Sequence, residues 1–555
     1  MGRGSIVEKP GERAAAYGPT VEQTKVSDTV TSKSPGPASF EILQCDLFCP
    51  RPGGSVARFP LEDMFVELSI FEDLYSNVLR GAITLRDTGG NLESMPIIGE
   101  ETLKISAYTK GSDLLPNSPS EKSQYIENDF RVTSIGNIVE EKDRVKLYTL
   151  NLVSPEYILN LSRKVQRSFP NSGDAGMLIS DMIYKIFNEN LIGNSGNVRL
   201  FNVEQTKGLH KISISNMTPF GAINFLASRS ISEINPDGAL FFFYETFRDG
   251  FRFESIETLF EQDLRATYVY SPQNIGEDAG INLYIAEFPE QISSFDVVSN
   301  AIAGMYNSRL IAHDIVRIKY SILDYNYVPQ AAETTSTEYD GDCNSISVTE
   351  TNPDAGSDEN YPKHQTRSVI NDTFNHLDNT SGFGNRLVTD DLDISAAPKR
   401  KYNPSVIRMF PTNNEHDILF NGTETGIKKG GGVSEPNIKT NQVEKWMLQR
   451  PAQLQMLNNI QIRFTVAGDT TRHVGDVVNF EMHSHLRDDT NQLYDGKYLV
   501  TQIRHRFGTN EFKTEMQLSK ESFNTKMDMQ KRSPENSLTE EEFMEQTAAE
   551  GGYLT

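Results

Sequence analysis

Cysteine, basic charge and long apolar runs are all scarce in this sequence. Only 3 of the 555 residues are cysteine, and an odd number without paired spacing argues against a disulfide framework and fits a reducing compartment. Lysine and arginine number 53 against 76 acidic residues, so the formal net charge is -23 and binding to nucleic-acid phosphates is disfavoured. No apolar run approaches the roughly 18 residues of a membrane span, and no signal peptide is visible. These absences predict a soluble protein made in the cytoplasm.

Motifs of common hydrolases and nucleotide-binding enzymes are also missing. The sequence has no G-x-S-x-G, H-E-x-x-H or S-x-x-K segment, and the glycines at 430–432 lack the spacing of a phosphate-binding loop. Acidic residues are numerous, but nothing marks a carboxylate pair with the separation that glycoside hydrolysis requires. We therefore predict that the chain is not an enzyme, has no catalytic residues and binds no cofactor.

Alternating apolar residues predict β-strands over much of the chain. The clearest run is 460–519, a second set covers 40–153, and Phe241-Phe242-Phe243 is interpreted as a buried strand rather than a ligand platform. A hairpin is expected around Asp249-Gly250. Tight turns are expected at Gly468-Asp469, Gly475-Asp476 and Asp495-Gly496.

Helices are expected mainly between the two strand-rich regions. Ser154 before Pro155 and Thr218 before Pro219 have the pattern of an N-cap followed by proline in the first turn. Asp174 is expected to open another helix between them. A further helix, 443–457, carries the only tryptophan of the chain and leads into the last strands.

This order of elements predicts two β domains of similar size, the second interrupted by a polar insertion. The first 38 residues are too polar to fold alone and are either a disordered tail or an arm that orders on a neighbouring subunit. The expected segments are 1–38 (N-terminal arm), 39–153 (first β domain), 154–238 (helical connecting domain), 239–328 with 455–520 (second β domain), 329–454 (polar insertion and connecting helix) and 521–555 (acidic tail).

Histidine and cysteine offer the only candidate metal ligands, and none forms a diagnostic set. His483 and His485 alternate on one expected strand and could bind a metal ion, with Asp488, Asp489 or His505 as further ligands. We favour the alternative interpretation, that these histidines lie at the surface and bind no metal. Cys45 and Cys49 have no second pair of cysteines, and Cys343 lies in the polar insertion. Small buried thiols are therefore expected, and no metal site is predicted.

Several segments together resemble the baseplate central hub proteins of T-even-like contractile-tailed phages, the myovirus tail hub family. The resemblance covers about 40–330 and 441–522. Its carrying segments are FVELSIFEDLYSNVLRGAITLRD, LYTLNLVSPEYILNLSRKV, WMLQRPAQLQMLNNIQIRFTVAGDTTRHVGDVVNFEM, YDGKYLVTQIRHRF and FKTEMQLSKES.

The resemblance implies a mixed, β-rich α+β fold with two tail-tube-like antiparallel β-barrel domains, joined by smaller α/β domains and carrying a long polar insertion. It also implies a structural protein of the virion tail baseplate, synthesised in the host cytoplasm. As a homotrimer it would adapt a hexameric tail tube, or a tube-initiator protein, to a trimeric central spike protein. Baseplate wedge proteins would surround it, and DNA would pass through its channel without specific binding.

Three other functions stay open at this point. The chain could be the spike-base protein of a bacterial contractile injection or secretion system, although an acidic tail rather than a triple-stranded β-helix follows its last strands. It could be a tail-associated cell-wall hydrolase, which the missing motifs disfavour. It could also be a glycan-binding adhesin whose polar insertion contacts a receptor.

Overall fold

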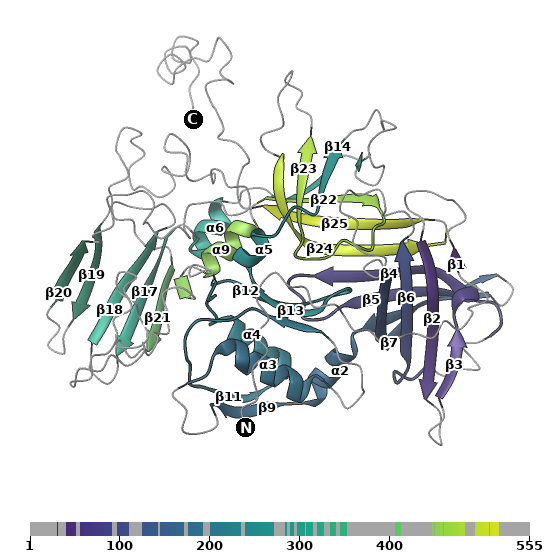
Figure 1. The fold of residues 1–555 in the computed structure, drawn as a ribbon, viewed down its shortest axis with the longest axis horizontal. Coiled ribbons are helices and arrows are strands. Elements are labelled where there is room, and N and C mark those ends of the chain that lie inside the picture. Colours follow the sequence, from purple (N-terminus) through teal and green to yellow (C-terminus); the bar gives the residue numbers. More distant parts are fainter. Residues whose placement is uncertain are drawn as a thin grey trace, which may run out of the picture.

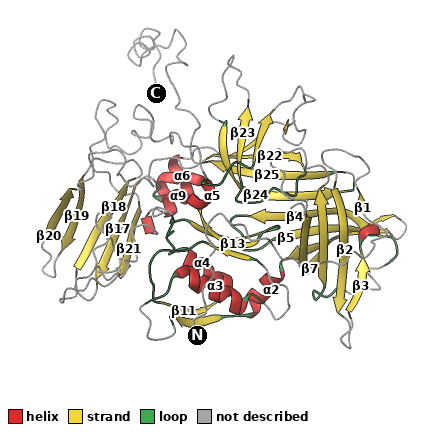
Figure 2. Ribbon diagram, in the orientation of Figure 1, coloured by secondary structure: helices red, strands yellow, loops and turns green. Residues whose placement is uncertain are grey.

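In the computed structural model, the protein is built mainly of strands, with one large, mostly antiparallel sheet and short helices beside it (Figures 1 and 2). No helix within the described ranges is long and apolar enough to cross a membrane. The structure describes residues 30–31, 40–50, 56–90, 97–109, 125–142, 145–170, 176–192, 200–234, 239–270, 284–285, 289–293, 297–305, 307–314, 319–326, 333–339, 345–351, 406–411, 447–448, 450–458, 460–482, 494–509 and 511–520.

The first β unit is formed by strands between Phe40 and Val153, as predicted. Alternate residues such as Leu68, Ile70 and Ile83 are buried in one core, because successive side chains of a strand point to opposite faces. The strands are β2 (Phe40–Pro50), β3 (Val56–Pro60), β4 (Phe65–Asp73), β5 (Arg80–Asp87), β6 (Thr102–Thr109), β7 (Tyr125–Lys142) and β8 (Val145–Val153). Their order in space is β2-β6-β7-β8-β5-β4, and both β3 and β1 (Val30–Thr31) pair with β2.

The second β unit combines strands from two distant parts of the sequence. It contains β14 (Ala266–Tyr270), β15 (Tyr284–Ile285), β16 (Glu290–Ser293), β22 (Ile460–Ala467), β23 (Val477–Met482), β24 (Gly496–Gly508) and β25 (Phe512–Lys520). The predicted strands in 460–519 are thereby confirmed. Ile462, Phe464, Phe480 and Leu518 lie in its core, which is separate from the core of the first unit.

A seam between β4 and β24 joins the two β units into a single sheet. Along one edge, β24 pairs with β23 through its first residues and then with β4 through residues 502–508. Its other edge pairs with β25, so the β24–β25 hairpin spans both units. Phe507 and Phe512, near the tip of this hairpin, stack at 4.1 Å between ring centroids inside the first core. Each β unit has a core of its own, but one sheet runs continuously through both units, so the division into two β domains stays a prediction.

A smaller unit with helices fills the space beside the first β unit (Figure 1). The Ser154-Pro155 and Thr218-Pro219 helix starts are confirmed, and the Thr218 hydroxyl caps its helix by accepting a hydrogen bond from the Gly221 N–H at 3.2 Å. The elements are α2 (Pro155–Ser162), β9 (Val165–Phe169), α3 (Ile179–Asn190), β10 (Phe201–Val203), β11 (Ile212–Met217) and α4 (Pro219–Ala227). Asp174 lies outside the described residues, but the prediction that it opens a helix is wrong, because Met177 forms a β-bridge with His210 and α3 begins only at Ile179.

Strand β12 (Phe241–Thr246) is buried along its whole length because it separates two cores. Phe241 and Phe243 point into the core of the helical unit, whereas Phe242 and Tyr244 point into the core of the second β unit. The strand pairs with β13 (Gly250–Ser255), and Gly250 in the turn has a φ of +75°, which glycine adopts without strain. The prediction of a buried Phe241-Phe242-Phe243 strand and of this hairpin is therefore confirmed.

The remaining described elements form a separate five-stranded sheet and three short helices. The sheet has the order β20-β19-β18-β17-β21. Its strands are β17 (Asn307–Asp314), β18 (Lys319–Asn326), β19 (Glu333–Tyr339), β20 (Ser345–Thr351) and β21 (Val406–Pro411), and the helices are α5 (Ile256–Phe260), α6 (Val297–Ala303) and α9 (Arg450–Leu457). The helix expected over 443–457 is thus described from Arg450 onwards. Its tryptophan, the glycines at 430–432 and both termini of the chain lie outside the described residues, and the six domain boundaries stay predictions.

Candidate functional site

The candidate site is a buried polar junction around Glu72, where β4 meets the β12–β13 hairpin and the loop before β23. The Glu72 carboxylate is fully buried. Its Oε1 accepts a hydrogen bond from the Phe247 N–H at 2.9 Å and lies 3.1 Å from Nδ1 of His473. Its Oε2 accepts a hydrogen bond from the Val474 N–H at 3.0 Å. One carboxylate therefore ties β4 of the first β unit to the β12–β13 hairpin and to the second β unit.

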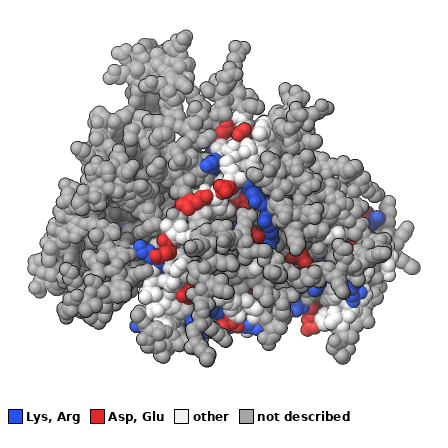
Figure 3. All heavy atoms as spheres, in the orientation of Figure 1, with Lys and Arg blue, Asp and Glu red and all other residues white. Residues whose placement is uncertain are grey.

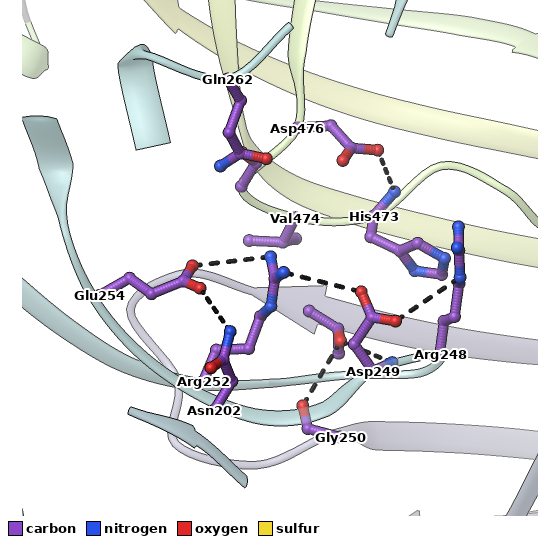
Figure 4. A network of polar contacts seen from close by, with 12 residues as sticks. Asn202, Arg248, Asp249, Gly250, Arg252, Glu254, Gln262, His473, Val474 and Asp476 are labelled. Carbon is purple, nitrogen blue, oxygen red and sulfur yellow. Dashed lines mark hydrogen bonds and ion pairs between the residues drawn. The ribbon is translucent and has the colours of Figure 1, made fainter. Parts of the chain in front are cut away.

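The loop 468–476 presents His473 and Val474 to this carboxylate through its own turns. Asp469 Oδ1 accepts hydrogen bonds from the N–H and the hydroxyl of Thr471, at 2.8 and 2.7 Å. The His473 N–H donates to Asp476 Oδ2 at 3.0 Å, as Figure 4 shows. Gly475 has a φ of +90°, so the predicted Gly475-Asp476 turn is confirmed.

Burial and mutual charge set different protonation states for the ionisable groups of the junction. Burial raises the pKa of Glu72, but the charge and hydrogen bond of His473 outweigh it, and the pKa lies below its usual value. Burial likewise lowers the pKa of His473, and Glu72 outweighs it, so this pKa is raised. Burial is the largest influence on His505 and lowers its pKa to about 4. When His473 is protonated, it therefore forms an ion pair with the Glu72 carboxylate, whereas His505 is neutral at neutral pH.

A second buried carboxylate, Glu245 of β12, links the helical unit to the first β unit. Its Oε2 accepts hydrogen bonds from the Leu79 N–H at 3.0 Å and from the Ser154 hydroxyl at 2.6 Å. Ser154 was predicted to cap α2, and the helix does begin after it, but its hydroxyl makes no capping hydrogen bond. The hydroxyl serves instead as a contact between units.

The β12–β13 hairpin is braced by a row of charged side chains below the loop 468–476 (Figure 4). Arg252 lies 3.5 Å from Glu254 and 3.8 Å from Asp249, and Asp249 lies 3.5 Å from Arg248. Asn202 of β10 donates to Glu254 at 3.2 Å. These contacts fix the hairpin turn, and therefore the Phe247 N–H, relative to Glu72.

The opposite face of the seam carries an ordered set of polar and charged side chains. Glu67 and Ser69 of β4 point away from the cores, as do Arg504 and Arg506 of β24 and Glu515 of β25. Arg504 lies 3.4 Å from both Glu67 and Glu515, and Arg506 lies 2.9 Å from Glu67. Basic and acidic residues are also interspersed over the described part of the face in Figure 3. The seam therefore has a buried face, on which Glu72 and His505 lie among core residues, and a charge-paired outer face.

Of the residues that the sequence offered as metal ligands, three lie within the described ranges, namely His505, Cys45 and Cys49. His505 is buried beside the Glu72–His473 pair, whereas His483, His485, Asp488, Asp489 and Cys343 lie outside the described residues. Cys45 and Cys49 are buried in the first core, as predicted. Within the described ranges, no group of three histidine, cysteine, aspartate or glutamate side chains is placed to hold a metal ion.

Sequence reasoning missed Glu72, the residue on which the junction depends. A signal was present, because Leu68, Ile70 and Glu72 alternate along β4 and the first two are core residues. An acidic residue in register with a buried apolar series predicts a paired, buried carboxylate. Its partner His473 lies 401 positions away, and no local pattern links the two.

No protein-family model and no curated relative matches the sequence. Among solved structures, a tail protein from Neisseria meningitidis is similar at 11% identity and a TM-score of 0.43, over 86% of this chain and 96% of that chain. A prophage tail protein from Shewanella oneidensis is similar at 8% identity and a TM-score of 0.41, over 86% and 98%. A type VI secretion component from E. coli is similar at 8% identity and a TM-score of 0.30, over 82% and 73%. At these identities and TM-scores, the similarities assign neither a family nor a function to the chain.

Proposed function

We propose that the chain is a structural protein of a contractile phage tail and that three copies form a baseplate hub between the tail tube and the central spike. The observation that carries this proposal is the seam between β4 and β24. It joins two β units within one chain, places both cores on one side of the sheet and leaves a polar face on the other. The resemblance of the segments within 40–330 and 441–522 to hub proteins supports the same role.

A hub needs its two β units held at a fixed angle. Three chains with two units each would present six units, which can match a sixfold tube while the ring itself keeps threefold symmetry. A flexible connection would not hold the six units in place. Here the tip of the β24–β25 hairpin packs in the first core, and the Glu72 carboxylate bonds to both neighbouring units. These contacts hold the two β units of one chain in a fixed arrangement, as a ring of three chains requires.

In this arrangement each β unit acts as a tail-tube-like barrel, and the polar face of the seam lines the channel. The spike protein binds at one end of the ring, the tube or a tube-initiator protein at the other, and wedge proteins surround the rim. DNA passes without sequence-specific contacts. The proposed role is mechanical, with no catalytic residues and no cofactor.

The mass of the purified protein in solution tests the proposal. Light scattering coupled to size-exclusion chromatography should give 3 × 62.3 kDa, about 187 kDa, over a range of loading concentrations. Averaged electron-microscope images down the ring axis should show six similar lobes around a channel. A particle that stays monomeric or dimeric at every concentration, or a trimer with three lobes, would rule out the adaptor role.

A further inference from the structure

The outer face of the seam combines an exposed aromatic ring with two arginines. Phe71 of β4 is 40% exposed, and the Arg504 guanidinium lies 5.5 Å from the centre of its ring. Arg506 lies two residues further along β24 and points to the same face. Exposed guanidinium groups bind nucleic-acid phosphates without sequence preference, and exposed aromatic rings stack on the bases of single strands. By side-chain type alone, this face would attract a polyanion.

Two glutamates of the same face pair with both arginines. Glu67 lies between them, with Oε1 3.4 Å from Nη2 of Arg504 and Oε2 2.9 Å from Nη2 of Arg506. Glu515 lies 3.4 Å from Nη1 of Arg504. The Ser69 hydroxyl accepts a further hydrogen bond from Arg504 at 3.1 Å. The local charge of the two arginines and two glutamates is 2 − 2 = 0.

We infer that Glu67 and Glu515 mask a DNA-binding surface on the outer face of the seam. While both carboxylates are present, a phosphate gains little from this face, because each guanidinium already has an anionic partner and few condensed counterions would be released. Replacing both carboxylates by amides leaves a charge of +2 beside an exposed aromatic ring. The inference rests on the proposed function in one respect, because the channel of the proposed ring is where DNA would meet this face.

This mechanism differs from repulsion by the total charge of the chain. A net charge of -23 acts over the whole surface and is screened beyond a Debye length of about 10 Å at moderate salt. Pairing within the seam acts at contact distance, where an unpaired arginine would hold a phosphate. The local pairing, rather than the distant acidic residues, therefore decides whether DNA adheres to this face.

The double variant Glu67→Gln with Glu515→Gln tests the inference in the purified full-length protein. Binding of a short fluorescein-labelled DNA duplex is measured by fluorescence anisotropy between roughly 50 and 200 mM salt. We expect no detectable binding by the wild type and clear binding by the variant at low salt, with a slope of log K against log salt of about −2, one for each freed arginine. Adding Arg504→Gln and Arg506→Gln to the double variant should abolish the gain.

A matched control changes the net charge by the same amount without exposing a cluster. Glu141 pairs with Arg86, and Glu189 pairs with Arg167, on separate elements of the fold. The variant Glu141→Gln with Glu189→Gln should bind DNA no better than the wild type. Equal binding by the two double variants, or no gain in the seam variant while its circular dichroism and thermal unfolding match the wild type, would overturn the inference. Because the assay uses neither tube nor spike, its result is independent of whether the chain is a hub.

Discussion

Acidification should weaken the buried junction through His505, and the effect can be separated from all other titrations. The His505 ring is completely buried between β4 and β25, with Glu72, His473 and Asp469 as the neighbouring ionisable groups. Its pKa of about 4 in the folded protein is below the 6.5 of an unfolded chain. Below pH 6.5 the unfolded state therefore binds a proton that the folded state excludes.

The size of the effect follows from the difference between the two pKa values. That difference is 6.5 − 4, and each pKa step corresponds to about 1.4 kcal/mol, so His505 contributes about 3 kcal/mol of stability above pH 6.5. A basic group whose pKa is lower in the folded than in the unfolded state contributes to the free energy of unfolding at high pH, and this contribution is lost as the pH falls. The loss begins near pH 6.5 and is complete near pH 4. His473 has a raised pKa and acts in the opposite direction, because its contribution is present at low pH and is lost as the pH rises.

The His505→Gln variant isolates this contribution, because glutamine keeps a polar group in the site and does not titrate. Urea unfolding followed by circular dichroism is compared for both proteins between pH 7 and pH 4. Glutamine should lower the stability at pH 7, but the wild type should then lose about 3 kcal/mol more than the variant as the pH falls. Parallel losses in the two proteins would refute the assignment of a neutral, buried His505.

Three further substitutions test the packing of the seam and of the loop beside it. Gly475→Val should lower the stability by about 1–3 kcal/mol in urea unfolding, because φ is +90° and a Cβ would lie 2.7 Å from the Tyr244 hydroxyl. Gly468→Ala should cost about 1–3 kcal/mol by the same measurement, since its Cβ would overlap the Phe512 ring. Phe507→Ala should cost about 3–5 kcal/mol, and amide hydrogen exchange should show the loss in β2 and β6 of the first unit rather than in β22. Unchanged midpoints, or exchange that rises only in β22, would contradict these assignments.

Sequence reasoning was most successful where the signal is local. The strands of 40–153 and 460–519, the turn at Gly475 and the helix starts at Pro155 and Pro219 each follow from period-two patterns or cap residues within a few positions. The buried Phe241-Phe242-Phe243 strand was predicted, but the reason for its burial was not. The alternation of side chains along a strand assigns successive residues to its two faces. Only the structure shows that a different core lies against each face.

The junction could not be predicted, because its contacts join residues that are far apart in the chain. The His473 ring contacts Glu72 across 401 positions, and the backbone of Val474 bonds to Glu72 across 402. A strand pattern specifies which face is apolar but not which partner strand lies beside it. In the structure, β24 (Gly496–Gly508) is long enough to pair with β23 through its first residues and with β4 through its later ones.

The seam also makes the first β unit depend on β24 and β25, which lie far from it in the sequence. Until residues 496–520 are in place, β4 lacks its neighbour β24 and the first core lacks Phe507 and Phe512. An uncovered strand edge and an incomplete core are unstable and prone to pair with other chains. The first unit therefore reaches its final form only when the last strands have been made. In the proposed ring, this dependence would exclude incomplete chains, because a chain without the β24–β25 hairpin has neither β unit complete.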